Sequence, residues 1–290
     1  MNLPIHDVID DIRTALLNSN RLILQAPPGA GKTTSVPLAL LDEPWLQEKQ
    51  IIMLEPRRIA ARSAASRMAH LLNENVGIRI GYQIRAEKKI SKETKILVVT
   101  EGILTRMLQR DPFLENVALI IFDEFHERHL HSDLSLTFAV QSQECLRQDL
   151  KILVMSAMLD TDSLQALLNN PPLITSEGRS YPIEIEYLPP NTPALEAKKI
   201  VPPLMDVIKN SIHTDEGSIL VFLPGTREIK AVETSLKEYC KDMEIDIAPL
   251  YGELSKEIQE RALAPSSKRK IVLSTNIAET SLTIEGIRVV

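Results

Sequence analysis

Ala26-Pro-Pro-Gly-Ala-Gly-Lys-Thr33 is the most informative segment of this 290-residue chain, and it lies between a short apolar run and a helical pattern. Gly29 and Gly31 let the backbone turn and direct its N–H groups toward phosphate oxygens, and the helix that follows adds partial positive charge. Lys32 can reach the β- and γ-phosphates of a nucleotide, and the Thr33 hydroxyl can bind Mg²⁺. We therefore expect a P-loop that holds a nucleotide through Ala26, Pro27, Pro28, Gly29, Ala30, Gly31, Lys32, Thr33 and Thr34.

One position departs from the usual P-loop pattern GxxxxGK[ST], because Ala26 stands where the pattern has glycine. The close approach to phosphate takes place between Gly29 and Thr33, so this departure is tolerable. The alternative is a glycine-rich turn that carries a surface lysine, and it fits the strand–loop–helix context poorly. The segment therefore predicts a nucleotide site without saying which class of P-loop enzyme carries it.

Outside this segment, short apolar runs alternate with longer amphipathic stretches, which is typical of βαβ units and of a parallel sheet covered by helices. The expected buried strands are 22–24, 51–54, 96–99, 119–122 and 152–155, and the expected helices are 60–72, 103–109 and 134–145. The alternation breaks at Asn170–Pro172, resumes with one strand near Ile174, and gives way to a proline-rich stretch that disfavours long central strands. We place a domain boundary near Arg179, which gives predicted domains of residues 1–178 and 179–290.

A second alternating series follows the proline-rich stretch. Its expected strands are 218–222, 246–250, 270–274 and 287–290, and its expected helices are 228–239 and 256–263. Because Val290 falls inside an expected strand, we expect the second sheet to be truncated within these residues and to leave a hydrophobic edge open. The predicted fold class is α/β, with two domains whose parallel sheets are covered by helices.

Two adjacent carboxylates, Asp123 and Glu124, come directly after the apolar run Leu119–Phe122. Such a pair at the end of a buried strand is costly without cations, and in a P-loop protein it marks the place of the second half of the nucleotide site. We expect Asp123 to bind Mg²⁺ and Glu124 to orient or deprotonate the attacking water, with Lys32 as the third catalytic residue and Thr33 and Glu124 as further metal-site residues. Without a P-loop upstream, polar residues that cap a strand would be the better interpretation.

Three histidines near this pair suggest a metal site as a rival interpretation. A helical zinc site needs two histidines four residues apart in H-E-x-x-H, but Leu130 stands where the second histidine would follow His126 and Glu127. No cluster follows that could supply a third ligand. We expect His129 and His131 to be solvated residues on a loop or at a helix start.

The composition excludes several classes of protein. The net charge of −6 and a pI near 5.6 exclude a chain that holds nucleic acid by bulk positive charge, so any such contact needs a local patch. The two cysteines share no motif, which favours a reducing cytoplasm over a disulfide framework. Residues 1–12 are not a signal peptide, and the longest apolar run, Val117–Phe122, is too short to cross a bilayer. We expect a cytoplasmic protein with no membrane partner.

Seven motifs in a fixed order extend over nearly the whole chain. The first five are Ala26–Thr33, Pro56-Arg57-Arg58 (motif Ia), Thr100-Glu101-Gly102 (motif Ib), Asp123-Glu-Phe-His126 and Ser156-Ala157. The last two are Phe222-Leu-Pro-Gly225 (motif IV) and Thr275-Asn-Ile-Ala-Glu-Thr-Ser-Leu-Thr-Ile284 (motif V). In this order they resemble the DEAH-type, superfamily 2 ATP-dependent RNA helicases, bacterial members above all. Two positions depart from the family pattern, because Phe125 stands in place of alanine and Met158 in place of threonine.

The resemblance implies two RecA-like P-loop domains that bind ATP with Mg²⁺ and one strand of nucleic acid, which would be single-stranded RNA. It places His126 and Ser156 at the nucleotide. The implied nucleic-acid contacts are Arg57, Arg58, Thr100, Glu101, Gly102, Thr275 and Asn276. Arginine forks and helix starts suit phosphates, but arginines can also form a solvated face and threonines can cap helices. Contacts to phosphates do not distinguish RNA from DNA.

Motif VI of the family, Q-x-x-G-R-x-G-R, would follow the strand that begins at Ile287, and it supplies arginines that stabilise charge on the transferring phosphoryl group. It does not occur in these residues, so we expect nucleotide binding with weak hydrolysis. Two alternatives stay open. A P-loop kinase or transferase would leave the second alternating series unexplained, and a non-catalytic ATP-gated clamp on nucleic acid would make the absent arginines a genuine feature.

Overall fold

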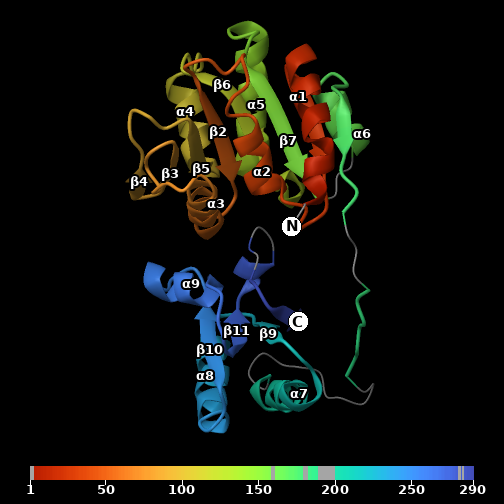
Figure 1. Ribbon diagram of the computed structural model, residues 1–290, viewed down its shortest axis with the longest axis vertical. Coiled ribbons are helices and arrows are strands. Elements are labelled where there is room, and N and C mark those ends of the chain that lie inside the picture. The colour runs from red at the N-terminus through yellow and green to blue at the C-terminus, as the bar shows by residue number, and fades with distance from the viewer. Residues whose placement is uncertain (1–2, 158–160, 179–181, 189–199, 280–281, 283) are drawn as a thin grey trace. The chain divides into compact units, whose positions relative to one another are not determined.

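The computed structural model describes all residues except 1–2, 158–160, 179–181, 189–199, 280–281 and 283. The chain divides into two compact units, Met1–Tyr181 and Pro182–Val290 (Figure 1). Several sequence features lie outside the described residues, namely Met158, Arg179, three of the prolines that follow it, and Thr280, Ser281 and Thr283 of motif V.

The first unit is built on an eight-stranded sheet with strand order β4-β3-β5-β2-β6-β7-β1-β8. Its strands are β1 (Arg21–Gln25), β2 (Gln50–Glu55), β3 (Ile80–Ile84), β4 (Glu87–Lys89), β5 (Ile96–Thr100), β6 (Val117–Phe122), β7 (Lys151–Ser156) and β8 (Leu173–Thr175). Its helices are η1 (Pro4–Val8), α1 (Ile9–Asn18), α2 (Lys32–Ala39), α3 (Arg58–Leu71), α4 (Glu101–Arg110), η2 (Phe125–Glu127), α5 (Leu130–Cys145) and α6 (Thr161–Leu167). Every strand pair is parallel except β3 with β4.

The expected parallel sheet with covering helices is confirmed in this unit, including all five of the predicted buried strands and the strand near Ile174. The β3–β4 hairpin at the sheet edge was not predicted from the sequence. A Cβ on Gly81 of β3 would lie 2.6 Å from the carbonyl oxygen of Lys89, so only glycine allows this close approach of the two strands. The edge strand β4 reads Glu-Lys-Lys, a charged sequence that gives no apolar signal and protects the edge from pairing with another chain.

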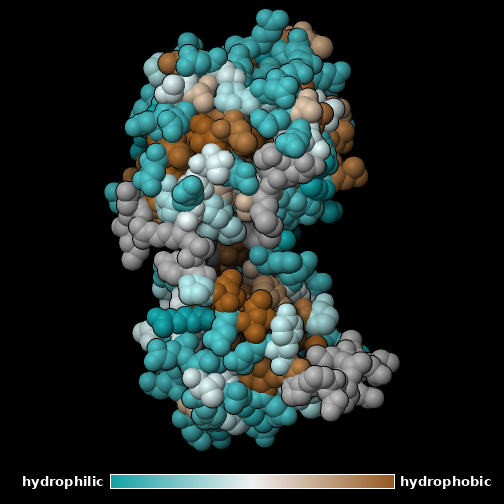
Figure 2. Space-filling model, turned by 90° about the vertical axis from the view of Figure 1, so that its right-hand side faces the viewer, coloured by the Kyte–Doolittle hydropathy of each residue, from teal (hydrophilic) through white to brown (hydrophobic). Residues whose placement is uncertain are grey.

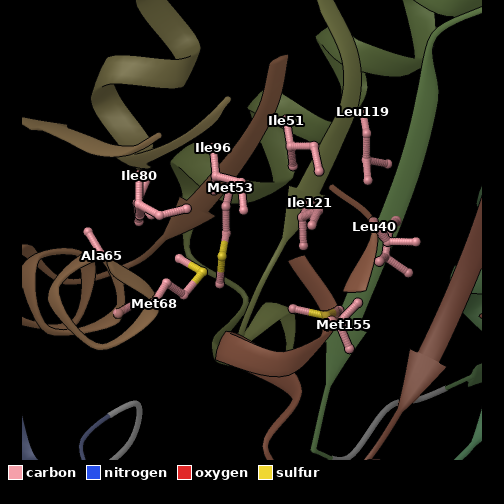
Figure 3. Close-up of a cluster of buried hydrophobic side chains, with 14 of the residues drawn as sticks. Leu40, Ile51, Met53, Ala65, Met68, Ile80, Ile96, Leu119, Ile121 and Met155 are labelled. Carbon is pink, nitrogen blue, oxygen red and sulfur yellow. The ribbon is translucent and has the colours of Figure 1, made fainter. Parts of the chain in front are cut away.

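Successive side chains of the central strands point into two separate apolar layers, one on each face of the sheet. Leu22, Leu24 and Met53 pack against α1, α2 and α3, and part of this layer is drawn in Figure 3. Ile23 and Ile52 point the other way and pack against α4, α5 and α6. Burial on both faces accounts for the nearly continuous apolar character of these strands.

Since β1, β2, β5, β6 and β7 are parallel, their carboxyl ends meet at one edge of the sheet, where α/β proteins bind their ligands. The P-loop follows β1, motif Ia follows β2, motif Ib follows β5, and Asp123-Glu124 follows β6. The fold therefore gathers four of the sequence motifs at this edge.

The second unit has a four-stranded parallel sheet with strand order β10-β11-β9-β12. Its elements are α7 (Val201–Thr214), β9 (Ser218–Phe222), α8 (Thr226–Tyr239), β10 (Ile245–Leu250), α9 (Lys256–Leu263), β11 (Arg269–Ser274), η4 (Asn276–Ala278) and β12 (Ile287–Val289). The predicted strands and helices of this series are confirmed. Helix α7 was not predicted, because Pro202 and Pro203 obscured it. Both prolines lie in its first turn, where a missing N–H costs nothing.

The surface seen in Figure 2 is largely hydrophilic, with apolar side chains gathered in patches. Within the described residues, none of the helices combines the length and the apolar character needed to cross a bilayer.

Candidate nucleotide and nucleic-acid site

The P-loop connects β1 to α2 through two glycines in the left-handed region, Gly29 at φ +76° and Gly31 at φ +94°. A Cβ on Gly31 would also lie 2.6 Å from Cδ1 of Leu3, so the loop rests directly on the N-terminal segment. The loop is fixed to its neighbours by backbone hydrogen bonds, from Ala26 N–H to the Ser156 carbonyl (2.9 Å) and from Ile5 N–H to the Ala30 carbonyl (3.2 Å). Both glycines are therefore required by the backbone, as the phosphate-binding prediction assumed.

Lys32, the first residue of α2, is only 3% exposed and donates a hydrogen bond of 2.9 Å to Oε1 of Glu124. Burial by itself lowers the pKa of the Lys32 ammonium, but the charges of Asp123 and Glu124 outweigh it, and the pKa is raised. Lys32 therefore carries a positive charge at the bottom of the P-loop.

Thr33 and Asp123 come together although 90 residues separate them, because the Thr33 hydroxyl donates a 2.5 Å hydrogen bond to Oδ2 of Asp123. The other carboxylate oxygen of Asp123 accepts a hydrogen bond of 2.8 Å from the backbone N–H of Glu124. A hydroxyl and a carboxylate are the oxygen donors that Mg²⁺ prefers, so the residues present fit this ion. In the described part of the chain, no three His, Cys, Asp or Glu side chains are arranged to hold a metal by themselves, and phosphates and water would complete the shell.

Glu124 adopts the left-handed region at φ +50°, an uncommon conformation for a residue with a side chain and one often found at functional sites. Its carboxylate is buried, and burial together with the charge of Asp123 raises its pKa, against the opposing effect of Lys32. Nδ1 of His126 lies 3.4 Å from Oε2 of Glu124. Burial and the charge of Lys32 lower the pKa of His126, which favours the neutral ring.

The structure adds Glu55, a residue that the sequence analysis missed. It is the last residue of β2, it is fully buried, and neither carboxylate oxygen has a hydrogen-bond donor. Burial and the charges of Asp123 and Glu124 raise its pKa well above the ordinary value. An acid at the end of an apolar run, directly before Pro56, was the signal in the sequence.

Glu55→Gln is expected to change how the stability of the metal-free first unit depends on pH. An acid whose pKa is raised on folding binds its proton more tightly in the folded state, so the free energy of unfolding falls as pH rises above the ordinary glutamate pKa. Glutamine has no such proton, and the two slopes should differ by up to about 1.4 kcal/mol per pH unit. Urea unfolding at about pH 5 and about pH 7, followed by the fluorescence of Trp45, the single tryptophan, measures both slopes. Equal slopes would contradict a buried, protonated Glu55.

The residues expected to contact nucleic acid in the first unit lie at the carboxyl ends of the adjacent strands β2 and β5. Arg58 is exposed at the start of α3, whereas Arg57 is half-buried and pairs with Glu127 at 3.3 Å. Thr100 precedes α4 without a side-chain capping hydrogen bond, and a Cβ on Gly102 would meet nothing within 4 Å. Glu101 faces inward, because its carboxylate pairs with His129 and accepts a hydrogen bond from Ser132.

The sequence predicts that His129 and His131 are solvated residues on a loop or at a helix start. Both are exposed in the first turn of α5 or directly before it. His129, however, also pairs with two carboxylates, Glu101 at 2.9 Å and Glu127 at 3.3 Å. His129 therefore contacts two acidic side chains, which its sequence pattern did not indicate.

In the second unit, Thr275 and Asn276 follow β11 at the carboxyl edge of its sheet. The backbone N–H of Thr275 donates to the Leu250 carbonyl, and its own carbonyl accepts a 2.8 Å hydrogen bond from the Ser274 hydroxyl. Asn276 begins η4. The strand end and its loop are thereby fixed to β10, as a segment that contacts a ligand through its backbone requires.

Comparison with known proteins identifies the two units. The family model described as DEAD/DEAH box helicase matches residues 9–167, and the helicase conserved C-terminal domain matches residues 203–290. The ATP-dependent RNA helicase HrpB of Escherichia coli is 48% identical over all of this chain, which covers 35% of that protein. HrpA of Borreliella burgdorferi, also an ATP-dependent RNA helicase, is 40% identical over 99% of the chain, again 35% of the relative.

The fold agrees with these sequence matches. The crystal structure of the E. coli DEAH/RHA helicase HrpB superposes with a TM-score of 0.88 at 47% identity, covering 99% of this chain and 36% of that one. The predicted pair of α/β helicase domains is thereby confirmed. The chain spans about a third of the length of the relatives that it matches.

Proposed function

This chain belongs to the DEAD/DEAH box helicase family, and from that premise we propose that it is the motor core of an ATP-dependent RNA helicase. In this proposal, residues 1–178 form the ATP-binding domain and residues 179–290 the second helicase domain. The observation that carries the proposal is the pair of hydrogen bonds that join the P-loop to the end of β6, Lys32 to Glu124 and Thr33 to Asp123. In this proposal, the two halves of the nucleotide site meet there.

Each residue of the site has a role that follows from its surroundings. Lys32, charged and buried, would bind the β- and γ-phosphates, while Gly29 to Thr33 would present backbone N–H groups to them. Thr33 and Asp123 would hold Mg²⁺, which neutralises phosphate charge when bound. Glu124, left without Lys32 as its partner, would accept the proton of the attacking water, a task for which its raised pKa suits it.

The nucleic-acid partner is proposed to be single-stranded RNA, bound through its phosphates and sugars. Arg58 is exposed and offers a fork for phosphate, and α3 and α4 begin at Arg58 and Glu101, where the N–H groups of a helix start suit a phosphate. Contacts of this kind position a strand without reading its sequence. The free cysteines Cys145 and Cys240 suit a reducing compartment, and we propose a cytoplasmic location.

We propose further that these 290 residues hydrolyse ATP slowly by themselves. No Q-x-x-G-R-x-G-R segment occurs among them to stabilise charge on the transferring phosphoryl group. A second candidate function is a non-catalytic clamp that closes on nucleic acid when ATP binds.

ATP turnover with and without single-stranded RNA, with Lys32→Ala as the control, tests the proposal. Slow turnover that RNA accelerates and that Lys32→Ala abolishes would support the motor. Tight nucleotide binding without any turnover would favour the clamp. Turnover indifferent to RNA but dependent on Lys32 would point to a P-loop transferase, and failure to bind nucleotide would contradict all three.

A further inference from the structure

His129 forms a bridge between two acidic side chains of the first unit. Its Nδ1 lies 2.9 Å from Oε1 of Glu101, and its Nε2 lies 3.3 Å from Oε2 of Glu127. The same Glu127 oxygen lies 3.3 Å from Nη2 of Arg57, and the Ser132 hydroxyl donates a 2.7 Å hydrogen bond to Glu101. Four polar side chains from three separate segments are thus connected through one imidazole.

Burial makes this bridge energetically significant. The carboxylates of Glu101 and Glu127 are only 13% and 9% exposed, so each needs a partner to offset its desolvation. An imidazole has two ring nitrogens, and His129 directs one of them toward each carboxylate, so that a single side chain reaches both. Arg57 brings a positive charge to the same oxygen of Glu127.

The segments that His129 bridges carry the proposed RNA contacts and the proposed catalytic carboxylates of the first unit. Arg57 follows β2 and Glu101 follows β5, the strands whose ends carry the proposed RNA contacts, whereas Glu127 follows β6, whose end carries Asp123 and Glu124. Strands β5, β2 and β6 are consecutive neighbours in the sheet. Within the loop after β6, the backbone N–H of Glu127 donates to the carbonyl of Glu124 at 3.0 Å. A short series of contacts therefore connects the proposed RNA-binding residues with Glu124, the proposed catalytic carboxylate.

We propose that His129 is a positioning residue that couples RNA binding to nucleotide binding in this unit, an inference that rests on the proposed function. An RNA phosphate that binds Arg57 competes with Glu127 for the same guanidinium. When Arg57 turns to the phosphate, His129 keeps Glu127 attached to Glu101 at the start of α4. The loop that carries Glu124 then keeps its position relative to motif Ib, and RNA binding is thereby transmitted to the nucleotide site.

His129→Ala removes the bridge with little harm to helix α5. The backbone carbonyl of residue 129 accepts the first hydrogen bonds of the helix, from the N–H groups of Ser132 and Asp133, and alanine keeps both. The side chain itself forms no capping hydrogen bond. His131→Ala is the matched control, because His131 is an exposed histidine two residues along that stands outside the bridge.

The test measures the dissociation constant of a short fluorescent single-stranded RNA by anisotropy, with and without saturating Mg²⁺ and a non-hydrolysable ATP analogue. The reciprocal measurement, analogue affinity with and without RNA, must give the same ratio. We expect a ratio of about fivefold or more for the unaltered chain and for His131→Ala, and a ratio within about twofold of unity for His129→Ala. Analogue affinity without RNA should be unchanged in both variants, a result that a folding defect would not give.

The outcomes separate the inference from the function on which it rests. If His129→Ala keeps the full ratio, or if His131→Ala loses it equally, His129 does not couple the sites and the proposed function still stands. If the unaltered chain binds the analogue but shows no change in RNA affinity, coupling in this chain is refuted. If the unaltered chain binds neither RNA nor the analogue, the proposed function fails and the inference fails with it.

Discussion

Lys32→Ala is expected to weaken the binding of Mg²⁺-ATP at least about a hundredfold. The variant loses charge-assisted hydrogen bonds to phosphate, each worth about 1.5–3 kcal/mol, and each 1.4 kcal/mol corresponds to tenfold in affinity. It also leaves Glu55, Asp123 and Glu124 without their buried cation, so the site that receives a polyphosphate becomes more negative. Both effects act in the same direction.

Glu124→Gln provides the matched contrast, because it breaks the same 2.9 Å ion pair from the other side. Here a negative charge is removed and Lys32 is released toward the phosphates, so the affinity for nucleotide should stay the same or increase while turnover is lost. Calorimetric titration of both variants with Mg²⁺ and a non-hydrolysable ATP analogue decides the matter. Equal weakening in the two variants would show that the ion pair is only a structural contact and would remove the main support for the proposed site.

Arg147→Met is expected to destabilise the first unit by about 3 kcal/mol or more. The guanidinium is buried and donates to the backbone carbonyls of Phe113 at 2.6 Å, Leu114 at 2.7 Å and Val117 at 3.0 Å. Methionine fills a similar volume but donates nothing, and each buried carbonyl left without a donor costs about 1–3 kcal/mol. These carbonyls form the turn into β6, the strand that positions Asp123 and Glu124.

Urea unfolding followed by Trp45 fluorescence measures this effect, because Trp45 packs against the core of the first unit. Asp149→Asn is the control. Hydrogen bonds from Arg147 hold the pKa of Asp149 below its ordinary range, so its contribution is present above the ordinary pKa and is lost as pH falls. Asp149 is 57% exposed, and the control should cost far less than Arg147→Met at neutral pH. Similar losses would assign the stability to the ion pair instead of the turn.

The sequence was sufficient wherever the signal is local. Strands such as β2 and β6 are apolar because both faces are buried, and the P-loop needs glycine at 29 and 31 because the backbone there has positive φ. Asp123 was predicted as a site residue because a charged residue directly after a buried strand is costly without a function, and it lies within hydrogen-bond distance of Thr33. The strands and helices of the second alternating series were also predicted from local patterns. The helicase family followed from the order of the motifs.

Which polar side chains pair when they are distant in the sequence could be seen only in the folded chain. The sheet order places β2 between β5 and β6, so Glu55 becomes a buried third acid beside Asp123 and His129 comes to lie between two carboxylates. Periodicity carries no information on which strands are neighbours, and a short charged edge such as β4 carries no apolar pattern at all. Burial and pairing of polar groups depend on that order, and therefore the residues that connect the motifs became visible only in three dimensions.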